Sequence, residues 1–138
     1  MRTSAGTRTL VRALRSGADP VYAASLVVAA PTAAAIRTLP RITIIASGLE
    51  GVSIADEDEE TAGLISERIL GRADDPMRTS RIQGGGGATR LRSTPWIDPE
   101  DLARCLDVDR FPFVLLARLN EGVVTLRAAR STESFPGV

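Results

Sequence analysis

The sequence contains no histidine, no lysine and only one cysteine. Without histidine, the chain cannot form a Ser-His-Asp triad, a Cys-His pair or most kinds of zinc site. Without lysine, it cannot form the Gly-Lys phosphate-binding motif of P-loop proteins. A single cysteine excludes a disulfide bond within the chain, and we expect Cys105 to be a buried residue of the core.

Long apolar runs and an excess of one charge are also missing. No stretch approaches the roughly 18 apolar residues of a membrane span, and residues 1–7 lack the apolar region of a secretion signal. The 17 basic and 17 acidic residues cancel, which argues against binding to nucleic acid or to a membrane surface. We therefore expect a cytoplasmic protein with neither of these partners.

Every basic residue is an arginine. Its planar donors suit carboxylates and phosphates, although a GC-rich genome produces the same bias. Residues 1–41 hold six arginines and one acid, whereas residues 50–60 hold six acids and no arginine. If the fold brings these segments together, a cationic wall would face an acidic one.

The pattern of apolar residues predicts one α/β domain over residues 1–130 and a loose tail over residues 131–138. Runs of β-branched residues, above all Arg-Ile-Thr-Ile-Ile-Ala, predict strands, and stretches with helical periodicity lie around them. This alternation is typical of βαβ units around a mainly parallel sheet. The predicted strands are 21–25 and 41–46, and the predicted helices are 7–16, 28–39 and 57–70.

The later part of the chain differs. Residues 72–94, with four consecutive glycines, predict a long mobile loop. Asp98 as a cap and Pro99 in the first turn predict a helix, and residues 113–126 predict a C-terminal hairpin. The chain opens on a turn that normally follows a strand, so we expect an N-terminally truncated domain. Its exposed sheet edge would favour pairing with a partner chain or a second copy.

Two segments have patterns that suit an anion and a cation. Residues 2–8, Arg-Thr-Ser-Ala-Gly-Thr-Arg, precede a helix and could hold a phosphate or carboxylate, although a simple helix cap has the same pattern. Residues 56–60 are five consecutive acids at a predicted helix start. Two or three acids there are favourable by roughly 0.3–1 kcal/mol each, whereas five repel one another. Mg²⁺, which takes one or two carboxylates together with water and substrate oxygens, would relieve that repulsion.

The glycine run 84–87 matches neither a dinucleotide-binding motif nor a P-loop, and it favours a flexible loop. Its flanking arginines could nevertheless close over an anion. These arginines are Arg78, Arg81, Arg90 and Arg92.

Several segments together resemble the 2-phosphosulfolactate phosphatase family. Residues 3–8, Thr-Ser-Ala-Gly-Thr-Arg, are similar to its Thr-x-Asn-Gly-Thr-Arg turn, and residues 23–30 are similar to its Gly-Ser-Phe-x-Asn-Ala segment. Glu-Asp at 57–58 with Ala-Gly-Leu-Ile at 62–65 resembles its Glu-Asp-x-x-x-Ala-Gly-x-Ile helix. Residues 106–113 resemble its closing strand region. The likeness covers most of residues 2–127, and the stretch 72–94 matches poorly.

The resemblance implies a Mg²⁺-dependent enzyme that hydrolyses the phosphomonoester of a small phosphorylated organic acid in coenzyme M biosynthesis. It implies that Glu57 and Asp58 bind the metal and that Arg8 stabilises charge developing on the phosphoryl oxygens. Asp56 is the nearest carboxylate that could accept a proton. The implied substrate-binding residues are Thr3, Ser4, Gly6, Thr7 and Ser25.

Two other functions stay open from the sequence. The chain could be an inactive remnant that binds a small phosphorylated metabolite or nothing. It could also be a scaffold domain that pairs with a separate chain supplying the missing strand.

Overall fold

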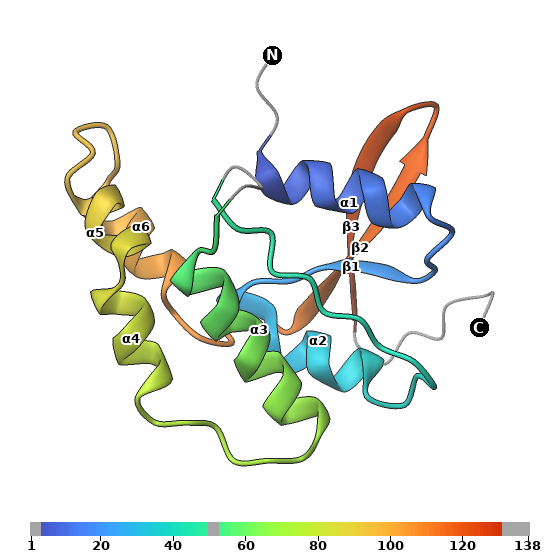
Figure 1. The fold of residues 1–138 in the computed structure, drawn as a ribbon, viewed down its shortest axis with the longest axis horizontal. Helices are drawn as coiled ribbons and strands as arrows, with labels where there is room; N and C mark the ends of the chain where they lie inside the picture. The colour runs from blue at the N-terminus through green and yellow to red at the C-terminus, as the bar shows by residue number, and fades with distance from the viewer. Residues whose placement is uncertain (1–3, 50–52, 131–138) are drawn as a thin grey trace.

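The computed structural model describes residues 4–49 and 53–130. Within these ranges the chain forms helices around a small sheet (Figure 1). Thr3, which the resemblance assigns to substrate binding, lies outside the described residues, as does the segment 131–138, predicted to be a loose tail. The elements in chain order are α1 (Ala5–Arg15), β1 (Val21–Ala23), the 3₁₀ helix η1 (Leu26–Val28), α2 (Ala29–Ile36), α3 (Asp56–Ile69), α4 (Arg78–Gly84), α5 (Gly86–Arg92), α6 (Pro99–Cys105), β2 (Phe113–Asn120) and β3 (Val123–Arg130).

The sheet is antiparallel, so the prediction of βαβ units around a mainly parallel sheet is wrong. Its three strands lie in the order β1-β2-β3, with Val21 opposite Ala117 and Phe113 opposite Arg130. The chain after β1 does not cross over to a parallel neighbour. Instead, β1 pairs with a strand that lies some ninety residues later, and the sheet direction is set by that long-range pairing.

The C-terminal hairpin is confirmed. Its loop consists of Glu121 and Gly122, whose φ angles are 50° and 82°. Positive φ at both central residues is the geometry of a type I′ turn, which matches the twist of the two strands. The predicted helices α1, α3 and α6 are also confirmed. The side chains of Ser4 and Asp98 cap α1 and α6, and α3 begins with acidic residues in its first turn.

Residues 41–46 form no strand, although their sequence was the clearest strand pattern. They run from α2 toward α3 without ladder pairing, and an isolated bridge between Leu49 and Ser53 follows. Ile44 and Ile45 are exposed to 37% and 57%. A strand needs a neighbour to satisfy its backbone N–H and C=O groups, and among the described residues none pairs with this segment.

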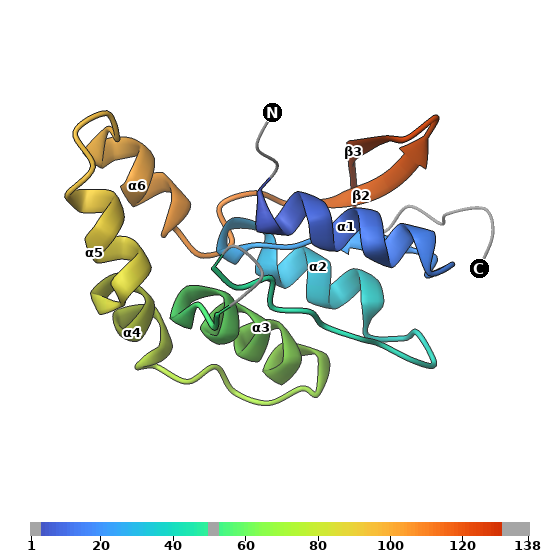
Figure 2. The same cartoon turned by 45° about the horizontal axis from the view of Figure 1, so that its top comes forward.

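The core lies where η1, α2, α3 and α4 meet. Helix α2 contacts both α3 and β2, so it lies between α3 and the sheet (Figure 2). Small side chains on α2, among them Ala29 and Ala33, let α3 approach closely. The buried side chains of this core are Leu26, Ala29, Ala33, Leu64, Ile65 and Ile82.

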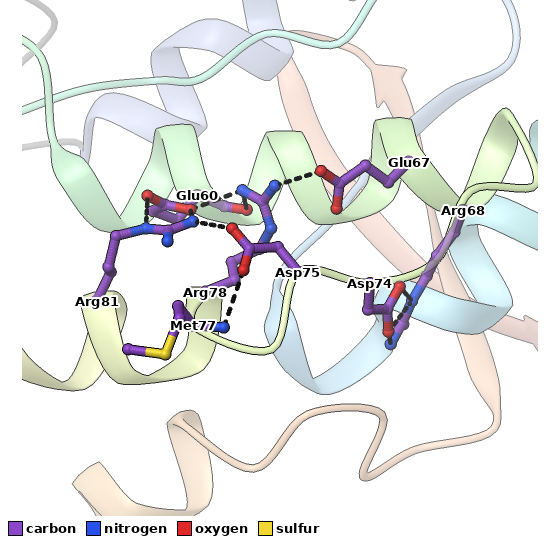
Figure 3. Close-up of polar contacts among 8 residues, drawn as sticks. All are labelled: Glu60, Glu67, Arg68, Asp74, Asp75, Met77, Arg78 and Arg81. Carbon is purple, nitrogen blue, oxygen red and sulfur yellow. Dashed lines mark hydrogen bonds and ion pairs between the residues drawn. The ribbon is translucent and has the colours of Figure 1, made fainter.

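Residues 72–94 contain two helices, α4 and α5, where the glycine run predicted a long mobile loop. Ion pairs connect α4 to α3 (Figure 3). Arg78 donates to Glu60 at 2.6 Å and to Glu67 at 2.7 Å, and Arg81 binds both Glu60 and Asp75. The hydrogen bond from Arg81 lowers the pKa of Glu60 below its ordinary value, although burial opposes the shift, and the charges of Arg81 and Arg78 lower it further. These long-range contacts order a segment whose local sequence favours flexibility.

Asp109 links three parts of the fold. Its carboxylate accepts from the backbone N–H of Ala30 at 2.6 Å, in the first turn of α2, and from Arg68 of α3 at 2.8 Å. Its own N–H donates to the carbonyl of Leu26. Since α2 has no side-chain cap of its own at Val28, Asp109 supplies one from about eighty residues away.

The helices that the structure describes are all too short or too polar to cross a membrane.

Candidate active site

A cleft with a volume of about 260 Å³ brings together polar side chains from three segments. Ser25 follows β1, Ser47 belongs to the extended segment before α3, and Glu57 and Asp58 lie in the first turn of α3. Figure 1 shows this end of α3 on the side of the molecule where α5 and α6 lie. Two carboxylates and the hydroxyls of Ser25 and Ser47 therefore lie in one small cavity, which Thr61 also lines.

Asp58 is held by the segment that precedes its helix. Its Oδ2 accepts from the backbone N–H of Gly48 at 2.7 Å and from the Ser47 hydroxyl at 3.1 Å. Gly48 adopts a φ of 69°, and a Cβ there would overlap the carbonyl of Ser53. A glycine is thus required at the turn that aims its N–H at Asp58.

Glu57 lies against α5. A Cβ at Gly87 would overlap the Glu57 carboxylate, so the space that this carboxylate occupies exists because residue 87 is a glycine. Gly87 is buried and Glu57 is half-buried. Among the residues that the structure describes, Glu57 has no hydrogen-bond partner for its carboxylate, in contrast to Asp58.

The start of α1 also lies near Ser47. A Cβ on Gly6 would lie 4.0 Å from the Ser47 Oγ. Ser4 accepts the N–H of Thr7 at 3.2 Å and its hydroxyl lies 2.9 Å from that of Thr7, so this pair forms the cap of α1. Arg8 is exposed and does not line the cleft. The opening turn therefore lies near Ser47 but outside the cleft that holds the acids.

The remaining predicted site residues are divided. Ser25 lines the cleft and occupies the position before η1, yet its side chain caps no helix. Asp56 is exposed, lies near Gly85 and does not line the cleft. Thr3 lies outside the described residues. The structure thus brings Ser25, Glu57 and Asp58 together and leaves Asp56 at the surface.

The cysteine and the loop arginines also differ from expectation. Cys105 is exposed and lines the cleft, so the prediction that it is a buried core residue is wrong. The buried residue of the short helix α6 is Leu102 instead. Arg78 and Arg81 bind carboxylates of their own chain. Arg92 lines a separate groove beside α6.

Sequence reasoning identified Ser47-Gly48 only as a loop that could hold a ligand, and it missed Gly87. Ser47-Gly48 follows an apolar run, and this position is typical of a ligand-binding loop. The pattern does not identify Asp58 as the hydrogen-bond partner of Ser47. Gly87 is one of four consecutive glycines, and only the packing of α5 on α3 distinguishes it from the other three.

Comparisons with known proteins add no relative: no family model, curated protein or solved structure matches the chain. The resemblance to the 2-phosphosulfolactate phosphatase family therefore stays a prediction from the sequence.

Proposed function

We propose that the chain is a cytoplasmic, Mg²⁺-dependent phosphomonoesterase that acts on a small organic phosphomonoester. The resemblance names 2-phosphosulfolactate as the first substrate to test. The observation that carries the proposal is the cleft shared by Ser25, Ser47, Glu57 and Asp58. Three of these four residues are ones that the resemblance assigns to the site.

The donor set suits Mg²⁺. This ion binds oxygen ligands and usually takes only one or two protein carboxylates, with water and substrate oxygens filling the other positions. Glu57 and Asp58 provide two carboxylates. Within residues 4–49 and 53–130 no cluster of three or more metal-ligating side chains occurs, so water and substrate would have to supply the remaining ligands. When bound there, Mg²⁺ would polarise a phosphoryl oxygen and acidify a water molecule.

The chain's own residues would orient the reactants. Ser47 and Gly48 fix the Asp58 carboxylate through Oδ2, so Oδ1 is the oxygen that could bind a metal ion. The Ser25 hydroxyl can donate to a phosphoryl oxygen. Since there is no histidine, a carboxylate must accept the proton of the attacking water. Glu57, the less constrained acid of the cleft, is better placed for this than Asp56.

A glycine-to-alanine pair tests the geometry of the proposed site. Gly87→Ala should displace the Glu57 carboxylate and reduce Mg²⁺-dependent phosphate release about ten- to a hundredfold, since small misplacements of catalytic groups have such effects. Stability should be unchanged or slightly raised, because Glu57 can move and alanine favours a helix by roughly 0.5–1 kcal/mol.

Gly84→Ala is the matched control, since a Cβ there meets no atom within 4 Å. Phosphate release and thermal unfolding would be measured for both variants and the parent. Equal activity of the two variants, or activity of the parent that is insensitive to chelation of Mg²⁺, would show that the site is misassigned.

A second candidate function is that of a scaffold that pairs through its open sheet edge. One observation favours it: a further hollow of about 360 Å³ lies between β1, α1 and the unpaired segment, with Tyr22, Leu10 and Ile45 among its walls. An extended strand of a partner chain or a second copy would satisfy the edge of β1. Sedimentation that shows a stable monomer at all concentrations, with no partner recovered, would argue against this function.

A further inference from the structure

We propose that the cleft selects phosphomonoesters whose carbon portion is apolar and carries no second anionic group. This inference rests on the proposed function and narrows its substrate class. It departs from the doubly charged substrate that the resemblance implies. Its evidence is the distribution of charge and apolar surface along the walls of the cleft.

The walls away from the acids are apolar. Side chains from the extended segment, α5 and α6 form them, and several retain exposure that a ligand would remove. Ile44 is exposed to 37% and Leu91 to 40%. The residues that form this part of the cleft are Ile44, Ile45, Ala88, Leu91, Leu102 and Leu106. A hydrocarbon chain that lies here would gain affinity by leaving water.

The described walls of the cleft contain no cation that could pair with a second anionic group. In the described part of the chain, no arginine lines this cleft. Arg78 and Arg81, which flank the glycine run, are bound to carboxylates of α3 and of the loop before α4. A sulfonate or carboxylate placed against the apolar walls of the cleft would lose water without gaining a cationic partner, which makes its burial unfavourable.

The size of the cleft sets a further limit. Its volume of about 260 Å³ lies just below the roughly 300–1,000 Å³ of sites for drug-sized ligands. The cleft therefore suits a short alkyl chain of a few carbons attached to the phosphoryl group. The phosphoryl group would occupy the end of the cleft where Mg²⁺ is bound.

Cys105 provides a readout of binding that does not depend on turnover. It is the chain's only cysteine, it is exposed, and it lines the cleft. The rate of its alkylation by N-ethylmaleimide, in the presence of Mg²⁺, would be measured against two stable phosphonates of similar length. Butylphosphonate has an apolar tail, and 3-phosphonopropionate ends in a carboxylate.

We expect butylphosphonate to protect Cys105 at a concentration at least about tenfold lower than 3-phosphonopropionate. From ethyl- to butylphosphonate, each added methylene should improve protection about three- to fourfold. Equal protection by the two probes, better protection by the carboxylate, or no protection by either overturns the inference.

A cation introduced into the apolar wall should reverse the preference. Leu91→Arg should favour 3-phosphonopropionate over butylphosphonate, whereas Leu126→Arg, at a similarly exposed site on β3 outside the cleft, should leave the parent's preference unchanged. An unaltered preference in Leu91→Arg counts against the inference.

Hydrolysis separates the two proposals. Protection with the expected preference but no hydrolysis of butyl phosphate would support the selectivity and overturn the phosphatase. Hydrolysis that is faster for 2-phosphosulfolactate than for butyl phosphate would support the phosphatase and overturn the selectivity.

Discussion

Replacing Glu57 by Gln and Asp58 by Asn together is expected to reduce Mg²⁺-dependent phosphate release by about a hundredfold or more. The two changes keep the size of each side chain and remove both negative charges of the cleft. A metal ion contributes several kcal/mol to stabilisation of the charged transition state, and each 1.36 kcal/mol corresponds to a tenfold change in rate. Steady-state phosphate release at saturating Mg²⁺ measures the effect.

Glu59→Gln is the matched control for this prediction. Glu59 belongs to the same first turn of α3, is exposed and does not line the cleft. Its replacement removes one acid from the helix start, so any general effect of charge on α3 is present in both variants. Equal activity of the control and the double variant would exclude a special role for Glu57 and Asp58.

Asp109→Ala is expected to destabilise the fold by about 2–3 kcal/mol, the largest effect on stability that we predict for one side chain. The change removes the cap of α2 and leaves the N–H of Ala30 and a nitrogen of Arg68 without their acceptor. Charge-assisted hydrogen bonds contribute roughly 1.5–3 kcal/mol, and 29% exposure of the Asp109 side chain keeps the cost below that of a fully buried pair. The loss should appear as a lower denaturant midpoint with an unchanged slope.

Asp107→Ala serves as the comparison, since its ion pair with Arg110 lies at the surface with exposures of 52% and 41%. Such a pair contributes about 0–1 kcal/mol. If the two alanine variants unfold at the same denaturant concentration, Asp109 does not link α2, α3 and η1 in the way described.

Local patterns predicted the elements whose causes are local. Helix α6 follows from the Asp98 cap and Pro99, and the hairpin follows from a two-residue turn with Gly122. Helix α3 begins where its acids favour a helix start. In each case, residues close in sequence determine the conformation.

The sheet could not be predicted in this way, since its direction depends on pairing between distant segments. β1 of three residues has no pattern that distinguishes a parallel from an antiparallel neighbour. Residues 41–46 have the β-branched composition of a strand but lack a paired neighbour. The α4 helix was missed for a similar reason, because Arg78 and Arg81 find their carboxylates on another helix.

The candidate site was predictable in part. A run of acids identified Glu57 and Asp58, but the same pattern included Asp56, which the helix directs to the surface. Successive residues of a helix point about 100° apart, so adjacent acids cannot all face one cleft. The role of Ser47 depends on a contact across eleven residues, which no motif encodes.

The central claim is that the starts of α1 and α3 meet at Ser47 and that the cleft beside it binds Mg²⁺ and a phosphoryl group. The most direct test is a titration of the chain with Mg²⁺ and then inorganic phosphate, followed by backbone amide NMR. We predict saturable shifts that centre on Ser47, Gly48, Glu57 and Asp58, with smaller shifts at Gly6. If these amides do not move, or if the shifts are spread over the surface acids without saturation, the account is contradicted.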